Sequence, residues 1–141
     1  MDRWIVFAFL SMLFAGFTSV VAKLGLAGIS AELGLAVRTS FVFVFVLAFA
    51  AFFVPAADIQ TLTWKNLLGL GLSAATTAAS WVFYYKAIQE GEVGTVAIID
   101  KGSFLIALVL AWLLLGERIT PRVALGSLLV LAGLLVVAWK R

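Results

Sequence analysis

The stretch "TVAIIDKGSFLIALVLAWLLLGE", Thr95–Glu117, decides the fold. It is apolar along most of its length, and about 20 such residues cross the ~30 Å hydrocarbon core of a bilayer as a helix. Backbone groups in lipid must find their hydrogen bonds within the segment, which favours a helix. We therefore predict a transmembrane helix over 93–115, with the opposite charges of Asp100 and Lys101 in its first third.

The composition extends this prediction to the whole chain. Of its 141 residues, 65% are hydrophobic and 12% are charged, whereas globular domains have about 45–50% apolar and about 25% charged residues. A soluble domain of this size cannot bury so much apolar surface, so lipid must surround most of the chain. We predict an all-α integral membrane protein with a single transmembrane domain over residues 1–141.

Four more segments are long and apolar enough to span a bilayer. The five predicted spans are Trp4–Leu26, Leu33–Val54, Trp64–Tyr85, Val93–Leu115 and Pro121–Trp139. Residues that cap, begin or break helices lie between them: Gly28, Ser30, Pro55, Thr63, Gly91, Thr120 and Pro121. The first apolar run exceeds the 7–15 residues of a signal-peptide core, so we expect it to stay in the protein.

The missing residue types exclude several functions. The chain has no cysteine and no histidine, so disulfides, thiolate metal sites and imidazole acid–base chemistry are excluded. No phosphate-binding glycine loop and no Ser-His-Asp set is present. The few basic residues form no basic face for nucleic acid. We expect neither an enzyme nor a resident metal or cofactor, and no nucleic-acid partner.

The basic residues that flank the spans nearly balance across the membrane. One side has Arg3, Lys65, Arg118 and Arg122; the other has Lys86, Lys140, Arg141 and, if its side chain reaches the headgroups, Arg38. The positive-inside rule therefore gives little orientation. Two interpretations stay open: a fixed orientation set by the first helix, or dual topology, in which copies insert both ways and pair antiparallel.

Five charges within or beside the spans fall on the side opposite the N-terminus: Lys23, Arg38, Lys86, Asp100 and Lys101. Long lysine and arginine side chains can snorkel to the headgroups, and we favour this for Arg38. Asp100 is too short to do so, roughly 10 Å into its helix, and we expect it to face inward. It would either form a structural ion pair with Lys23 or Lys86, or meet the cargo. Neighbours on a helix lie about 100° apart, so Asp100 and Lys101 are not expected to pair.

Small and aromatic residues complete the candidate site. Asp100 and Ser103 begin a stripe of mostly small residues along the fourth span, and "SAATTAAS", Ser73–Ser80, is small all round. Such residues permit close helix packing or leave room for a cavity. Trp81 and Tyr85 could line a substrate path, or Tyr85 could belong to an interfacial aromatic belt. The candidate substrate-binding or coupling residues are Lys23, Trp81, Tyr85, Asp100 and Ser103.

The order and spacing of these features resemble a known family. "GTVAIIDKGSFLIALVLAWLLLGERITPRVALGSLLVLAGLLVVA", Gly94–Ala138, resembles the C-terminal helix pair of an EamA domain of the drug/metabolite transporter superfamily. The residues that carry the likeness are Gly116-Glu117-Arg118, Thr120, Gly126 and Gly133. "SVVAKLGL", Ser19–Leu26, and "WVFYYKAIQEGEVG", Trp81–Gly94, resemble the same domain, so the likeness covers nearly the whole chain.

The resemblance implies a carrier of small metabolites or drugs that works by alternating access, with two domains packed inverted around a central cavity. Members usually hold two such domains in ten helices, whereas this sequence has one. The two-domain members often have a proline where this chain reads Asp100-Lys101, so no substrate is carried over from them. The membrane-embedded glutamate of the related four-helix multidrug exporters has no counterpart in the first span, so proton-coupled cation export is not expected.

The sequence thus predicts half of a secondary transporter, multi-pass in the cytoplasmic (inner) membrane. Its expected partners are a small-molecule substrate, membrane lipid and a second copy in an antiparallel homodimer. The alternatives are a homologous half-transporter as partner, or an accessory membrane subunit or flippase half that needs a non-identical partner.

Overall fold

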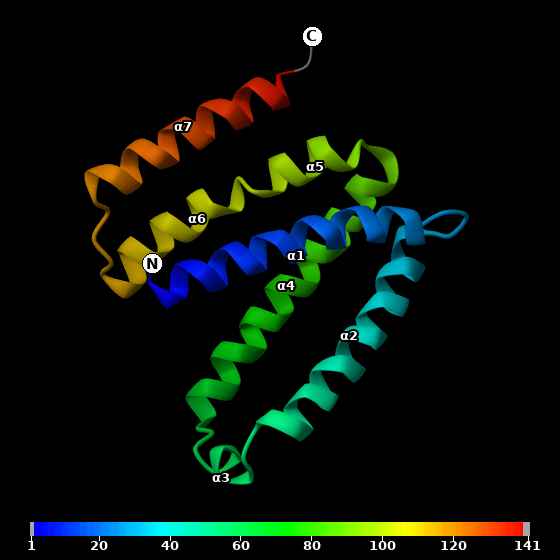
Figure 1. Ribbon diagram of the computed structural model, residues 1–141, viewed down its shortest axis with the longest axis vertical. Helices are drawn as coiled ribbons and strands as arrows, with labels where there is room; N and C mark the ends of the chain where they lie inside the picture. The colour runs from blue at the N-terminus through cyan, green and yellow to red at the C-terminus, as the bar shows by residue number, and fades with distance from the viewer. Residues whose placement is uncertain (1, 140–141) are drawn as a thin grey trace. The chain divides into compact units, whose positions relative to one another are not determined.

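The computed structural model describes residues 2–139, and the described chain is helical with no strand (Figure 1). Its elements in chain order are α1 (Arg3–Gly25), α2 (Ala31–Phe53), α3 (Ala56–Ile59), α4 (Trp64–Glu90), α5 (Val93–Asp100), α6 (Ser103–Leu110), the π-helical turn η1 (Ala111–Leu115) and α7 (Pro121–Ala138). Lys140 and Arg141, which entered the charge balance above, lie outside the described residues.

The five predicted spans are confirmed. The segments long and apolar enough to cross a membrane are Arg3–Gly25, Ala31–Phe53, Trp64–Glu90, Val93–Leu115 and Pro121–Ala138. The third span is longer than predicted, since α4 continues through Lys86–Glu90 to end beside Gly91. Lysine, alanine, glutamine and glutamate all favour helix, so the chain leaves the helix only at the glycine.

The helices begin and end at the residues that the sequence indicated. The Ser30 hydroxyl accepts a hydrogen bond from the Leu33 N–H at 3.2 Å, and Thr120 Oγ1 accepts one from the Val123 N–H at 3.3 Å. Such side-chain caps satisfy N–H groups that have no partner within the helix. Gly116 ends the fourth span with a φ of 68°, a left-handed conformation that glycine adopts without steric cost.

Very little of the surface of these helices is covered by the chain itself. Among the described residues the buried hydrophobic side chains are Leu26, Ala31, Tyr85, Ile88 and Leu134. By contrast Phe52 is 85% exposed and Trp4 is 68% exposed. An apolar surface of this extent is stable only in contact with lipid or with another protein.

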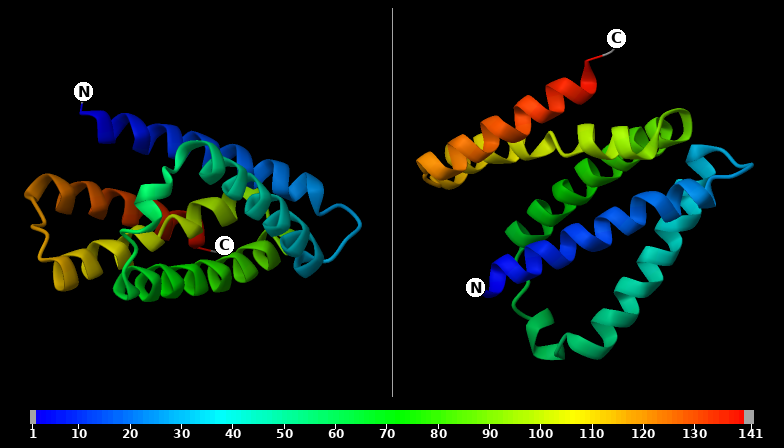
Figure 2. Two further views of the ribbon diagram at one scale, coloured as in Figure 1. Left: turned by 90° about the horizontal axis from the view of Figure 1, so that it is seen from below. Right: turned by 45° about the horizontal axis from the view of Figure 1, so that its top comes forward.

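The contacts within the chain divide it into two compact units, which we describe separately. The α2–α4 unit, Val21–Glu90, contains the last turn of α1 and the antiparallel helices α2 and α4, joined through α3 (Figure 2). The α5–α7 unit, Met1–Val20 with Gly91–Arg141, contains the rest of α1 and the contact of α5 with α7.

The fourth span is not the continuous helix that the sequence predicted. It is interrupted by a turn at Lys101–Gly102, visible as the gap between α5 and α6 (Figure 1). In this turn N–H groups bond to the oxygen three residues earlier instead of four: Gly102 to Ile99 at 2.9 Å and Phe104 to Lys101 at 3.1 Å. These are the tighter bonds of a 3₁₀ turn, so the span consists of two shorter helical pieces.

Glycine at position 102 suits this turn. A Cβ atom there would lie 3.0 Å from the Ile99 main-chain oxygen and 3.6 Å from Leu134 Cδ1. Leu134 belongs to α7 and is among the buried side chains. The break in the fourth span therefore packs directly against the fifth span, and there is little space for a side chain at the contact.

Candidate functional site

The end of α1 is tied to the end of α4 by Lys23. Its ammonium group donates hydrogen bonds to the main-chain oxygens of Ile88 and Gln89, the latter at 3.0 Å. These oxygens belong to the last turn of α4, whose carbonyl groups lack partners within the helix and carry partial negative charge. Lys23, a predicted binding residue, is thus placed as a cap on the C-terminus of α4.

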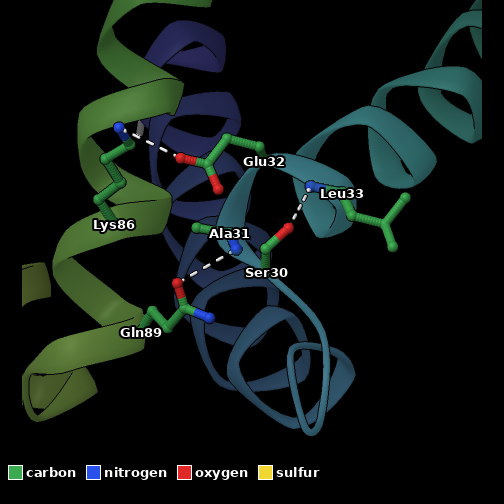
Figure 3. A network of polar contacts seen from close by, with 6 residues as sticks. All are labelled: Ser30, Ala31, Glu32, Leu33, Lys86 and Gln89. Atoms are coloured by element: carbon green, nitrogen blue, oxygen red, sulfur yellow. Dashed lines mark hydrogen bonds and ion pairs between the residues drawn. The ribbon is translucent and has the colours of Figure 1, made fainter.

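The Gln89 side chain makes a second connection in the same place. Its Oε1 accepts a hydrogen bond from the Ala31 N–H at 3.1 Å, and its Nε2 donates one to the Ile29 oxygen at 2.9 Å. Figure 3 shows the Gln89 amide at the start of α2, beside the Ser30 cap. Ala31 is only 2% exposed, so Gln89 provides a partner for a backbone N–H that water reaches poorly.

Lys86 lies one turn earlier on α4 and pairs with Glu32 near the start of α2. Its Nζ is 3.2 Å from Glu32 Oε1 (Figure 3). The two side chains are 52% and 64% exposed, and exposed pairs of this kind contribute little to stability. Lys86, one of the two partners expected for Asp100, is therefore already engaged in an ion pair within its own unit.

The Arg38 side chain of α2 lies against α4. Its guanidinium carbon is 4.5 Å from the centroid of the Trp81 ring and 5.9 Å from that of Tyr85. Trp81 and Tyr85 are four residues apart and therefore share one face of α4. Attraction to the aromatic faces holds the head against the neighbouring helix. That the Arg38 side chain reaches the headgroups stays a prediction.

In the Arg38 cluster, which we define as Arg38, Trp81 and Tyr85, one buried donor has no hydrogen-bonding partner among the described residues. Arg38 Nη1 is buried and finds no acceptor in the described part of the chain. Tyr85 is only 4% exposed, so it does not belong to an exposed interfacial belt. Both aromatic residues were predicted as candidate site residues, whereas Arg38 was not predicted as their partner.

A groove follows the same pair of helices. It has a volume of about 470 Å³ and is lined by Leu35, Thr39, Leu70, Ser73, Ala74, Thr77, Ala78, Trp81 and Val82. A smaller hollow of about 290 Å³ shares Leu35, Thr39 and Val82 with it and reaches the Glu32–Lys86 pair. Close helix packing and a cavity were both open for the small residues of the third span. On the face of α4 toward α2, Ser73, Ala74, Thr77 and Ala78 line this groove.

The groove offers hydrogen-bond acceptors as well as apolar surface. Thr77 Oγ1 donates to the Ser73 main-chain oxygen at 2.8 Å. Because its hydroxyl proton is used within the helix, the Thr77 oxygen presents lone pairs and no donor. Together with the Trp81 ring, this gives a surface that can hold a small, partly apolar molecule.

Asp100 and Ser103 belong to the α5–α7 unit. Asp100 ends α5, and its Oδ2 lies 4.0 Å from Lys101 Nζ. The expectation that these neighbours do not pair is wrong, because the 100° spacing holds only for a continuous helix and the chain turns at Lys101. Ser103 begins α6 and is exposed. A pairing of Asp100 with Lys23 stays a prediction.

The residues collected here suit non-covalent binding. Within residues 2–139 no group of three or more His, Cys, Asp or Glu residues is placed to hold a metal ion. The Arg38 cluster and the groove share Trp81, which lines the groove and also lies under the guanidinium. This part of the α2–α4 unit combines a fixed positive charge, aromatic faces and a cavity with hydroxyl groups.

Comparison with known proteins gives two matches. The family model described as the EamA-like transporter family matches residues 2–139. A protein from Sinorhizobium sp, described as an "uncharacterized transporter in cobO 3'region", is 33% identical over 140 residues, which are 97% of this chain and 97% of that protein. No solved structure matches the chain significantly.

Proposed function

This chain belongs to the EamA-like transporter family, and we propose that it is a secondary transporter of small metabolites or drugs that works by alternating access. It is a multi-pass membrane protein with five apolar helices long enough to span. Family membership and the name of the relative point to a transporter rather than an enzyme. We place it in the cytoplasmic (inner) membrane.

The groove between α2 and α4 is the observation that carries this proposal. Its volume of about 470 Å³ falls in the range of about 300–1,000 Å³ typical of small-molecule sites. Its lining combines small, hydroxyl and aromatic side chains with Leu35, Leu70 and Val82, a mainly apolar surface with a few polar groups, as in small-molecule sites. We assign it, with Trp81 and Tyr85, to the substrate path.

Transport by reconstituted protein tests this assignment. Trp81 and Phe83 offer a matched pair: both are aromatic residues of α4, but Trp81 lines the groove and Phe83 is 72% exposed. Trp81→Leu should lower uptake into proteoliposomes at least tenfold, while Phe83→Leu should leave it unchanged. If the two substitutions change uptake equally, the groove is not part of the substrate path.

We further propose that the working unit is an antiparallel homodimer of dual topology. The balanced flanking charges support insertion in both orientations, and the exposed helix surfaces leave ample area for a second copy. The Sinorhizobium relative is matched along 97% of its own length, which supports one five-helix domain as a recurring unit. Two inverted copies would supply the two domains that transporters of this kind use.

The chain contains no cysteine, so single introduced cysteines report topology directly. Ser30 and Thr61 flank the α2 span and must lie on opposite sides of the membrane. With dual topology, a membrane-impermeant maleimide should label about half of Ser30→Cys and about half of Thr61→Cys in intact cells. Full labelling of one variant and none of the other would overturn dual topology.

Function of the dimer needs its own test. Basic residues added at one end of the chain bias its orientation, so copies can be fixed in either direction. Each fixed copy should be inactive alone, and co-expression of both should restore transport. Activity of one fixed copy alone would exclude the antiparallel homodimer, and a requirement for another membrane protein would favour an accessory subunit or flippase half.

A further inference from the structure

Arg38 brings a permanent positive charge into a membrane span. A guanidinium group stays protonated in proteins, so it cannot become neutral when it leaves water. Arg38 is seven residues into α2, about 10 Å along the helix from Ala31. A charge at this depth needs compensation, and such residues are typically functional.

The surroundings of Arg38 compensate this charge only in part. The α2–α4 unit has three carboxylate side chains, Glu32, Asp58 and Glu90. Glu32 pairs with Lys86, and among the described residues none of the three is within ion-pair distance of Arg38. The rings of Trp81 and Tyr85 attract the guanidinium, but Nη1 is left buried without an acceptor.

The Arg38 guanidinium is suited to a particular kind of hydrogen-bond acceptor. The guanidinium carbon lies over the Trp81 ring, and a guanidinium carries five N–H donors arranged in its plane. The partner that satisfies two of these donors at once is an oxyanion, a carboxylate or a phosphate. The aromatic rings fix the orientation of the guanidinium, so less conformational entropy is lost when such an anion binds.

We propose that Arg38 binds the anionic group of the transported molecule, and that the substrate is a small organic anion with a carboxylate or phosphate group. This proposal rests on the proposed transport function. Trp81, which contacts the guanidinium and lines the groove, places the apolar part of the substrate next to its charged group. In this proposal Arg38, whose side chain was predicted from the sequence to reach the headgroups, determines the class of substrate.

The first test uses the unmodified protein. Phenylglyoxal reacts with arginine side chains, and mass spectrometry reports each site separately. Benzoate or phenyl phosphate should slow the modification of Arg38 at least fivefold, while benzamide, which has the same ring without the charge, should not. Arg118 and Arg122 serve as internal controls, whose modification should not change. Equal rates at Arg38 with and without the anions would overturn the proposal.

Variants give the second test. Arg38→Gln should weaken benzoate binding, measured from the ligand-induced rise in the unfolding temperature in detergent, by at least tenfold. Arg38→Lys keeps the charge but loses the two-pronged geometry, so it should bind with intermediate affinity. Lys65→Gln removes one positive charge at the other end of α4 and should bind like wild type. Wild-type affinity in a folded Arg38→Gln protein would refute the assignment.

A lipid phosphate is the other source of an oxyanion. Nanodiscs of phosphatidylcholine alone and with phosphatidylglycerol separate the two sources. If the anion comes from the solute, benzoate should protect Arg38 in both lipids. Protection by phosphatidylglycerol without any effect of benzoate would identify a headgroup site and overturn the substrate proposal.

Counterflow in proteoliposomes separates this inference from the transport function. The panel contains benzoate, phenyl phosphate, benzamide and benzylamine. Arg38-dependent exchange of the anions supports both proposals. If benzamide or benzylamine is exchanged and Arg38→Gln does not change this exchange, the transport function is supported and the anion specificity is overturned. If the anions bind in a way that depends on Arg38 but no solute is exchanged, the anion site is supported and the transport function is overturned.

Discussion

The ammonium nitrogen of Lys23 lies 3.0 Å from the main-chain oxygen of Gln89. The two residues are 66 positions apart in the sequence, and the contact ties the last turn of α1 to the last turn of α4. Lysine near a helix C-terminus compensates the partial negative charge of the free carbonyl groups. This position indicates that Lys23 stabilises the helix ends, whereas Arg38 has a buried donor without an acceptor in the described part of the chain.

Replacing Lys23 should therefore affect stability more than transport. Lys23→Met removes the charged cap and should lower the free energy of unfolding by about 1–2 kcal/mol. Lys23→Arg should recover part of the loss. Thermal unfolding in detergent, together with KM and kcat of proteoliposome transport below the unfolding temperature, checks this. A raised KM with an unchanged unfolding temperature would instead make Lys23 a binding residue.

Replacing the Nε2 donor of the Gln89 side chain should destabilise the protein. In Gln89→Glu an oxygen replaces Nε2 opposite the Ile29 oxygen, so two acceptors face each other, although the bond from the Ala31 N–H can persist. Gln89→Ala leaves both backbone groups without their partner. We expect a loss of about 1–3 kcal/mol for either variant, measured by thermal unfolding.

Glu90, next to Gln89, provides the control for these variants. It is exposed at the end of α4, and Glu90→Gln should leave the unfolding temperature close to that of wild type. If Gln89→Glu unfolds at the same temperature as Glu90→Gln, the two amide hydrogen bonds contribute nothing to the stability of this corner.

The ion pair of Glu32 with Lys86 should prove weak. Both side chains are more than half exposed, and solvent and salt screen such pairs. A double-mutant cycle with Glu32→Gln and Lys86→Gln should give a coupling energy close to zero, and high salt should change it little. A strong coupling would show that the pair is shielded from water, for example by a second copy of the chain.

Gly102 should be sensitive to the addition of a side chain. A Cβ atom there comes close to Ile99 and Leu134, so Gly102→Ala should lower the unfolding temperature and Gly102→Val should lower it further, with a loss of about 1–3 kcal/mol for valine. At Gly94, in the same span, a Cβ meets no atom within 4 Å. Gly94→Ala should not lower the unfolding temperature, and equal effects at both positions would exclude tight packing at the turn.

The helices could be predicted from the sequence because lipid restricts the backbone conformations that an apolar segment can adopt. Long apolar runs must be helical in a bilayer, and Ser30, Thr120 and Gly116 mark their ends by local chemistry. The break in the fourth span was missed. Asp100-Lys101-Gly102 carries no proline, and its turn lies against Leu134 in α7, a contact that local sequence does not report.

The candidate site could be predicted only in part. Trp81 and Tyr85 stood out as aromatic residues beside a run of small ones, but Arg38 looked like any arginine near the end of a span. Its role depends on the register of α2 against α4. Glu32 pairs with Lys86. Arg38 lies six residues after Glu32 on α2, and Trp81 lies five residues before Lys86 on the antiparallel α4, so the same register brings Arg38 to Trp81. That register could have been sought by matching opposite charges across the antiparallel hairpin.

The connections at Gln89 can form only late in the synthesis of this part of the chain. Ile29 and Ala31 precede Gln89 by 60 and 58 residues, so they leave the ribosome well before their partner is synthesised. The start of α2 therefore lacks these hydrogen bonds until the end of α4 emerges. Completion of the third span is therefore the step at which this part of the nascent chain can fix its helices together.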